Sequence, residues 1–253
     1  MEEKLYQLRQ LLRRLGKIVI SYSGGVDSSF LLKIAKEELD NNVTAVIVRS
    51  VTMFSEELNF AEKFAAETGV NSIVKDIDLL SDSDIKNNKK YRCYNCKYQI
   101  FKIARETADS LAVEYVLDGT NYDDLKEFRP GRKAAKEYNI KSPLMELKFS
   151  KSEIRYIMKK MGMSIWDKES NTCLLTRFPE NYEVSLQELR TIERLENFIR
   201  SLYKFKRLRL RVLEKKIKIE VDEADKNVFY NRKISSIIFK EIEKAGYTAK
   251  MSV

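Results

Sequence analysis

Residues 17–28, with the sequence KIVISYSGGVDS, indicate how this chain folds. The first six residues form a short β-branched run that is typical of a buried strand. Two glycines follow, and then an apolar pattern with helical spacing occupies residues 28–39. The order strand, tight turn, helix is the opening unit of an α/β fold.

The same alternation recurs along the first two thirds of the chain. Further strand-like runs and helical patterns occupy residues 43–48, 55–69, 71–77, 95–110 and 114–120. Such alternation predicts a parallel sheet with helices on both faces. The polar stretch 81–92 is expected to be a loop, and Ser150 and Glu153 match a capping box ahead of an amphipathic helix that ends near Gly162.

The pattern changes after Pro179, where a second, smaller domain is expected. It contains a long helix, two basic strand-like runs and a last helix, at residues 185–203, 206–212, 216–221 and 234–245. We therefore predict two domains, an α/β domain at 1–177 and a small α+β domain at 178–253.

Composition limits the class of protein. No apolar run reaches the roughly 18 residues that cross a bilayer, and the charged N-terminus has no signal-peptide core. We therefore expect a cytoplasmic protein without a membrane span. The net charge of +9 favours anionic partners, which could be nucleotides, RNA or an acidic membrane surface.

The chain contains no histidine and only three cysteines. The absence of histidine excludes Ser-His-Asp and Cys-His nucleophile activation and every histidine-ligated metal site. An odd, small number of cysteines argues against a disulfide framework and favours metal or thiol chemistry.

The segment after the first strand is a candidate phosphate loop. Its glycines let the backbone turn tightly, so that successive N–H groups and the helix N-terminus can face an anion. The two serine hydroxyls can add hydrogen bonds, and Asp27 can orient the loop or help to hold Mg²⁺. The nucleotide-binding residues of this loop are Ser23, Gly24, Gly25, Val26, Asp27 and Ser28.

The alternative is a glycine turn that only joins strand to helix. A Walker motif, G-x-x-x-x-G-K-[ST], is absent, which argues against transfer of the γ-phosphoryl group. The SGGVDS loop resembles instead the PP-loop superfamily, whose members cleave ATP between the α and β phosphates and leave AMP on an acceptor. On this resemblance we assign Asp27 and Ser28 to catalysis.

The cysteines form a C-x-x-C pair, Cys93 and Cys96, and a distant third residue, Cys173. A structural zinc site normally has four ligands and would need a carboxylate here. A [4Fe-4S] cluster can be held by three cysteines, which leaves one iron open to hydrosulfide. The alternatives are cysteines that act as small hydrophobes and a Cys173 that is itself a nucleophile or the sulfur source.

Several segments together resemble the LarE family of ATP-dependent sulfur transferases. They are SGGVDSS, RCYNCK, GTNYDDLKEFRPG, KSPL, WDK, CLLTR and LRLR, in this order over about residues 1–221. The resemblance implies that ATP adenylates a carboxylate of pyridinium-3,5-dicarboxylate mononucleotide and that sulfur then displaces AMP. The resulting thiocarboxylate is an intermediate of the nickel-pincer nucleotide cofactor.

The cysteines resemble those of the cluster-dependent members of this family. Members with only the cysteine of the CLLTR-like segment give up that side-chain sulfur, whereas members with the C-x-x-C pair as well depend on a cluster. The resemblance therefore implies a [4Fe-4S] cluster on Cys93, Cys96 and Cys173 that carries the transferable sulfide, with Cys173 also in a catalytic role. The resemblance also implies that free sulfide or another sulfur donor supplies the sulfur that is transferred.

Other residues receive roles by position or by resemblance. Gly119 and Thr120 end a predicted strand, and we expect them to meet the nucleotide at the carboxyl edge of the sheet. Arg209 and Arg211 alternate along a strand and share one face, and by resemblance they bind the substrate phosphate together with Arg177. The alternative for the strand is a solvated basic surface.

Some positions stay unassigned. Asp123 and Asp124 could bind Mg²⁺ or cap a turn, and Arg49, Ser50, Arg129 and Asp167 could serve nucleotide, substrate or fold. The chain departs from the family pattern at Thr176, Leu213 and Glu214 and in its C-terminal tail. A homo-oligomer stays open, and these departures make the substrate and the oligomeric state less secure than the ATP chemistry.

Two other functions compete with this one. The first is a cluster-dependent tRNA thiolase, because some thiolases of this superfamily also use a C-x-x-C pair and a third cysteine. The second is a non-catalytic RNA- or nucleotide-binding module built on the basic segment 204–218 with Tyr203 and Phe205. The second leaves the SGGVDS loop unexplained.

Overall fold

The computed structural model describes residues 2–126, 130–169 and 171–251, which form two compact units. The first unit consists of Met1–Asp78 and Tyr91–Ser170, and the second of Leu79–Lys90 and Asn171–Val253. Residues 171–177 thus pack with the second unit, and the predicted boundary at 177/178 stays a prediction.

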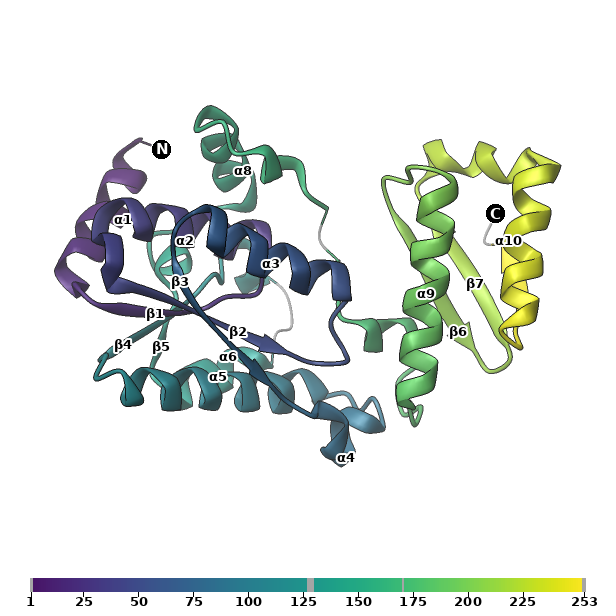
Figure 1. The fold of residues 1–253 in the computed structure, drawn as a ribbon, viewed down its shortest axis with the longest axis horizontal. Coiled ribbons are helices and arrows are strands. Elements are labelled where there is room, and N and C mark those ends of the chain that lie inside the picture. Colours follow the sequence, from purple (N-terminus) through teal and green to yellow (C-terminus); the bar gives the residue numbers. More distant parts are fainter. Residues whose placement is uncertain (1, 127–129, 170, 252–253) are drawn as a thin grey trace. The chain divides into compact units, whose positions relative to one another are not determined.

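The first unit is built on a five-stranded parallel sheet with the strand order β3-β2-β1-β4-β5 (Figure 1). Its strands are β1 (Ile18–Ser21), β2 (Val43–Arg49), β3 (Asn71–Asp76), β4 (Tyr115–Asp118) and β5 (Ile140–Lys141). The order reverses between β1 and β4, which pair in parallel from Ile18 with Tyr115 to Ser21 with Asp118. In such sheets ligands bind at the carboxyl ends of the strands beside this reversal.

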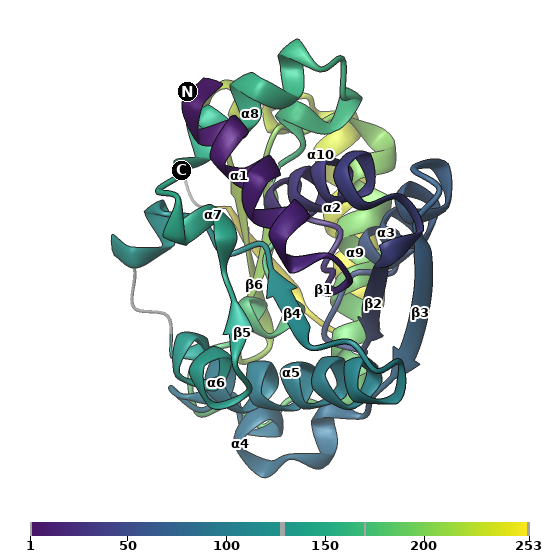
Figure 2. The same ribbon diagram turned by 90° about the vertical axis from the view of Figure 1, so that its left-hand side faces the viewer.

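Helices cover both faces of this sheet, as the sequence predicted. Figures 1 and 2 show α1, α2 and α3 on one face and α5 and α6 on the other. The helices of this unit are α1 (Glu2–Leu15), α2 (Val26–Leu39), α3 (Ser55–Glu67), α5 (Arg92–Ser110), α6 (Gly131–Glu137), α7 (Pro143–Glu146) and α8 (Lys151–Lys160). Short 3₁₀ helices in the described part of both units are Asp40–Asn42, Leu79–Ser81, Asp123–Lys126, Ser164–Asp167, Leu174–Arg177 and Glu223–Tyr230.

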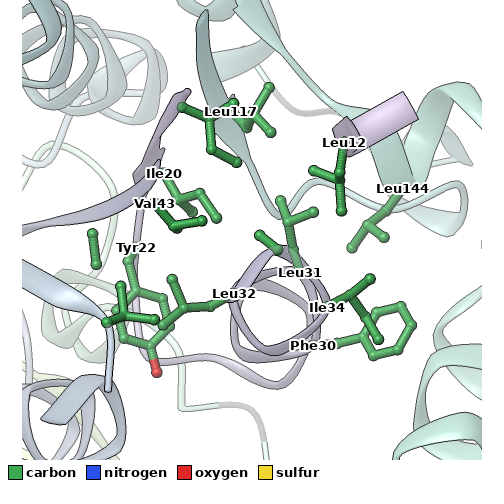
Figure 3. Packing of buried hydrophobic residues seen from close by; sticks show 14 of the residues in the cluster. Leu12, Ile20, Tyr22, Phe30, Leu31, Leu32, Ile34, Val43, Leu117 and Leu144 are labelled. Atoms are coloured by element: carbon green, nitrogen blue, oxygen red, sulfur yellow. The ribbon is translucent and has the colours of Figure 1, made fainter. Parts of the chain in front are cut away.

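Helix α2, which follows the candidate loop, is largely buried. Figure 3 shows its apolar side chains among those of the sheet and of neighbouring helices; the labelled residues are Leu12, Ile20, Tyr22, Phe30, Leu31, Leu32, Ile34, Val43, Leu117 and Leu144. Full burial of each such side chain contributes about 1.5–3 kcal/mol relative to exposure. The start of α2, and the loop attached to it, are therefore held firmly.

Local signals set several boundaries. The predicted capping box is present, because Ser150 accepts from the Glu153 N–H and the Glu153 carboxylate accepts from the Ser150 N–H. Helix α5 begins at Arg92, three residues before the predicted start. The predicted loop 81–92 contains a short helix, α4 (Ser83–Lys86), because the Asp82 carboxylate accepts from two N–H groups of its first turn.

The second unit is a small α+β structure, as expected. Its three-stranded sheet has the order β6-β7-β8, with β6 (Leu208–Leu213), β7 (Lys216–Val221) and β8 (Thr248–Met251). Helix α9 (Leu186–Leu202) packs on β6, and α10 (Arg232–Lys244) packs on α9 and β8. Strand β8 was not predicted.

Among the described residues, no helix is both long enough and apolar enough to cross a membrane.

Candidate active site

The candidate phosphate loop joins β1 to α2 in a conformation that requires glycine. Gly24 has a φ of +72°, and an added Cβ would lie 2.8 Å from the Cβ of Ala61 in α3. Gly25 precedes the first residue of α2 and has no side chain to cap it. The first N–H groups of α2 are therefore open to an anion, as a phosphate loop requires.

Hydroxyl groups line the same loop. The Oγ atoms of Ser23 and Ser28 lie 3.1 Å apart, and the Ser28 hydroxyl also donates to the Gly25 carbonyl at 3.1 Å. Val26 is buried, so the first turn of α2 is anchored in the core. The structure thus brings all six predicted loop residues together at the carboxyl end of β1.

Asp27 is the least satisfied polar group of this loop. Its Oδ2 accepts a hydrogen bond from Asn121 Nδ2 at 3.0 Å, whereas its Oδ1 is buried and has no hydrogen-bond partner among the described residues. Burial raises the pKa of the Asp27 carboxyl above its ordinary value, although nearby Lys151 and the Asn121 hydrogen bond oppose the shift. A buried carboxylate oxygen without a donor suits a cation such as Mg²⁺.

The end of β4 lies against the start of α2. A Cβ on Gly119 would be 2.7 Å from the backbone N and Cα of Ser28, so only glycine fits there. Thr120 donates its hydroxyl to Asp118 at 2.6 Å, and Asp118 also accepts from Ser142 at 2.7 Å. The predicted neighbours Gly119 and Thr120 therefore do lie beside the loop, with the Thr120 hydroxyl engaged by Asp118.

Asp123 and Asp124 make turn-capping contacts. Asp124 accepts from the Asn121 N–H at 3.1 Å, and Asp123 accepts from the Lys151 N–H at the start of α8 at 2.8 Å. The hydrogen bond from Lys151 lowers the pKa of the Asp123 carboxyl below its usual range. Of the two alternatives left open by the sequence, these contacts favour capping.

The WDK segment reaches the loop through its lysine. Lys168 Nζ donates to the Gly24 carbonyl at 3.1 Å and to Glu57 Oε2 at 2.6 Å, and it lies 3.6 Å from the centroid of the Phe60 ring. Asp167, whose role the sequence left open, is exposed. The segment therefore contributes its third residue to the loop.

The other unassigned positions lie elsewhere. Arg49 forms an exposed ion pair with Asp76 at 2.6 Å, where β2 and β3 end. The Ser50 hydroxyl lies 3.1 Å from that of Thr52. Arg129 is outside the described residues.

Cys93 and Cys96 lie on the first turns of α5. Their spacing of three places them on one helix face. Cys173 belongs to the second unit, and none of the three, all of them in described segments, forms a disulfide. Within the described residues of either unit, no three cysteine or carboxylate side chains converge as metal ligands. A cluster shared by the three cysteines stays a prediction.

Arg177 is a buried part of the second unit. Its Nε and Nη2 donate to the two carboxylate oxygens of Glu196 at 2.8 and 3.0 Å, and its Nη1 donates to the hydroxyls of Thr172 and Thr176. Both side chains of the ion pair are fully buried, and Glu196 also accepts from the Leu210 N–H at 2.9 Å. These contacts favour a role in which Arg177 joins the CLLTR segment to α9 and β6.

Arg209 and Arg211 lie on the face of β6 that is turned away from α9, because the alternate residues of the strand are buried. Arg211 donates to Glu220 on β7 at 2.9 Å and to the Thr176 carbonyl. Arg209 forms no hydrogen bond or ion pair with another described residue. Burial and neighbouring guanidinium groups lower its pKa from the ordinary value. A cation in this state is suited to an anionic ligand.

Comparisons with known proteins identify relatives of this chain. The family model described as NAD synthase matches residues 3–108, which include the loop. Uncharacterized proteins of Synechocystis sp. and Methanocaldococcus jannaschii are 37% and 40% identical over 202 and 188 residues, which are 80% and 74% of this chain and 75% and 71% of theirs.

A third relative has a named activity. The pyridinium-3,5-bisthiocarboxylic acid mononucleotide synthase of Lactiplantibacillus plantarum is 32% identical over 238 residues, which are 91% of this chain and 86% of the synthase. The chain belongs to the LarE family. The PP-loop and the α/β fold expected of this LarE protein are thereby confirmed.

Three polar residues of this LarE protein were not singled out from its sequence. Asn121 contacts Asp27 across 94 positions, Lys168 contacts Gly24, and Glu196 holds Arg177. Asn121 and Lys168 lie in the segments GTNYDDLKEFRPG and WDK that carry the family resemblance, and Glu196 had a signal of its own. It falls on the apolar stripe of α9, where a charged residue must have a partner if the stripe is buried.

Proposed function

We propose that this protein activates a carboxylate of pyridinium-3,5-dicarboxylate mononucleotide with ATP and replaces AMP by sulfur, in the biosynthesis of the nickel-pincer nucleotide cofactor. The relative from Lactiplantibacillus plantarum, aligned over 91% of the chain, supports this substrate. The observation that carries the ATP chemistry is the loop itself, with an uncapped helix start and a buried carboxylate oxygen that lacks a donor.

The first step is an adenylation. A carboxylate oxygen of the substrate attacks the α-phosphorus of ATP, the bond between the α-phosphorus and the bridging oxygen breaks, and pyrophosphate leaves. The N–H groups at the start of α2, with the hydroxyls of Ser23 and Ser28, would bind the phosphates. Asp27 would hold the Mg²⁺ that accompanies the nucleotide, because its Oδ1 accepts no hydrogen bond from the described residues. Gly119 and Thr120 would border the nucleotide.

The second step exchanges oxygen for sulfur. Hydrosulfide attacks the activated carbonyl carbon, the bond to the phosphate oxygen breaks, and AMP leaves with a thiocarboxylate and a proton as the other products. Adenylation makes this exchange possible because AMP is a far better leaving group than oxide.

The cysteines are proposed to hold the sulfur. Cys93, Cys96 and Cys173 provide three thiolates in a chain without histidine, and this donor set fits a [4Fe-4S] cluster. When bound, the cluster would supply an iron with an open position for hydrosulfide. Two of the ligands share one face of α5, and all three side chains are at least partly exposed, so a ligand can reach them.

The arginines of β6 are proposed to bind the substrate phosphate. Arg209 and Arg211 lie on one face of the strand, and Arg209 has no partner among the described residues to compete with a phosphate. Arg177 would contribute to substrate binding indirectly. Through Glu196 it would hold the segment that contains Cys173, and the strand β6, in place.

Pyrophosphate release tests the acceptor. Anaerobically purified protein should release pyrophosphate from ATP with the pyridinium dicarboxylate mononucleotide and not with tRNA. Release with tRNA alone would favour the thiolase, and no release with either, together with tight RNA binding, would favour the non-catalytic module.

The absorption spectrum tests the sulfur carrier. The anaerobic protein should show a broad brown absorption that disappears in the Cys93→Ala variant, and its iron content should fall with it. A colourless protein that contains zinc would contradict the cluster. Loss of the mass of H₂S from Cys173 after turnover would show instead that this side chain is the sulfur source.

A further inference from the structure

The WDK segment, residues 166–168, has no role in the mechanism described so far. Its backbone is fixed from α8, because Arg155 donates to the carbonyls of Trp166 and Lys168 at 2.7 Å each. The Trp166 ring packs against the main core of the first unit. The side chain of Lys168 therefore starts from a defined place.

That side chain is held by three groups near the phosphate loop. Its ammonium donates to Glu57 and to the Gly24 carbonyl and lies over the ring of Phe60. The side chains of Lys168 and Glu57 are only 20% and 14% exposed. A partly buried ion pair holds its geometry more firmly than a surface pair, because water competes less for its hydrogen bonds.

Gly24 is constrained from two sides. Its Cα lies so close to α3 that an added Cβ would meet Ala61 at 2.8 Å, and its carbonyl oxygen accepts from Lys168. The peptide that joins Gly24 to Gly25 is planar and trans. Its carbonyl and the Gly25 N–H therefore point in opposite directions, so a hydrogen bond that fixes the carbonyl also fixes the direction of the N–H.

We propose that Lys168 is a positioning residue for the phosphate loop. Its ammonium fixes the peptide between Gly24 and Gly25, and thereby aims the Gly25 N–H at a phosphate of ATP. Glu57 keeps the ammonium in place and neutralises its charge. This inference rests on the proposed binding of ATP at the loop and adds to it a residue that touches no phosphate.

Binding of α,β-methylene-ATP, which cannot be cleaved between these phosphates, tests the inference by calorimetry. Lys168→Met should raise the Kd about tenfold or more, because an N–H that is free to turn binds the phosphate less well. Lys168→Arg should recover most of the affinity, since a guanidinium can bridge a carboxylate and a carbonyl. Glu57→Gln should raise the Kd by a smaller factor.

Lys159→Met is the matched control. Lys159 is also a lysine over an aromatic ring of the same region, but its ring is Trp166 and it has no hydrogen bond to the loop. Its removal should leave the Kd within about twofold of the wild type. Binding of adenosine provides a second control, because a loop that has lost its phosphate orientation should still bind the nucleoside as before.

The outcomes separate the inference from the proposed function. A wild-type protein that does not bind the ATP analogue contradicts the function itself. If the wild type binds and Lys168→Met binds equally well, the positioning role is wrong. Equal weakening for adenosine and the analogue, or no recovery with Lys168→Arg, would show that the lysine serves only the general fold.

Discussion

Two carboxylates with buried oxygen atoms, Asp27 in the first unit and Glu196 in the second, have opposite environments. Both oxygens of Glu196 accept hydrogen bonds, from Arg177 and from the Leu210 N–H. Asp27 has one oxygen bound to Asn121 and one that is buried without a donor. The comparison separates architecture from function. Loss of one partner from a satisfied buried pair destabilises the fold, whereas a buried oxygen without a donor among the described residues is available to a ligand.

The arginines of the second unit show the same contrast. Arg177 is fully buried and bound to Glu196, whereas Arg209 is half-buried and has no ion pair with another described residue. Its pKa is lowered by burial and by other guanidinium groups. Removal of a satisfied charge should therefore cost stability, and removal of an unsatisfied one should cost binding.

Loss of Arg177 is expected to have the largest effect. Arg177→Met leaves the buried Glu196 carboxylate with only the more distant Arg200 guanidinium, at 4.0 Å, as a counter-charge, which should lower the free energy of unfolding by about 3–5 kcal/mol. Urea denaturation measures it. Lys244→Met is the control in the same unit, because Lys244 is 62% exposed in its pair with Glu241 and should change stability by about 1 kcal/mol or less. Equal effects of the two variants would contradict the expectation that the buried pair matters more for stability than the exposed one.

Neutralisation of Asp27 should give the reverse result. Asp27→Asn is expected to lower pyrophosphate release about a hundredfold or more, because the variant cannot hold the cation beside the phosphates. Its unfolding midpoint at neutral pH should be equal to that of the wild type or higher. A variant that lost stability and kept its activity would contradict the functional role.

The pH dependence of this difference follows from the raised pKa of Asp27. The folded chain binds this proton more tightly than the unfolded chain, so the contribution of Asp27 to stability falls as the pH rises from the ordinary aspartate range through the raised value. The stability of the Asp27→Asn variant relative to the wild type should accordingly be highest at neutral pH and decrease at acid pH. Thermal unfolding at several pH values measures it.

Removal of Arg209 sharpens the comparison within the second unit. Arg209→Met should raise the KM for the pyridinium mononucleotide about tenfold or more, since one charged phosphate contact is lost. The KM for ATP and the unfolding midpoint should stay unchanged. Steady-state pyrophosphate release with each substrate varied separates the two constants. A fall in stability, with KM unchanged, would instead assign Arg209 to the fold.

The smallest effects are expected at two matching helix caps, one in each unit. Ser150 and Ser185 form capping boxes with Glu153 and Glu188. Ser150→Ala and Ser185→Ala should each lower the free energy of unfolding by about 1 kcal/mol, with no change in substrate KM. A change in KM with either variant would show that the caps also affect the site.

The sequence predicted those parts of the fold that depend on neighbouring residues. The β-branched run before Gly24, the helix after it and the capping box at Ser150 follow from local preferences and short periods. Strand β5 has only two residues, Ile140 and Lys141, and strand β8 completes a sheet near the end of the chain. Neither was predicted, because such short strands are specified by their partners and not by their own pattern.

The candidate site divides in the same way. The sequence by itself determined the phosphate loop, because the tight glycine turn and the open helix start that follows it are local. Only the tertiary structure decided that Asn121 and Lys168 reach this loop and that Glu196 holds Arg177. These contacts join residues 94, 144 and 19 positions apart. Their partners are chosen when the core packs and buried charges must be satisfied, which no local pattern encodes.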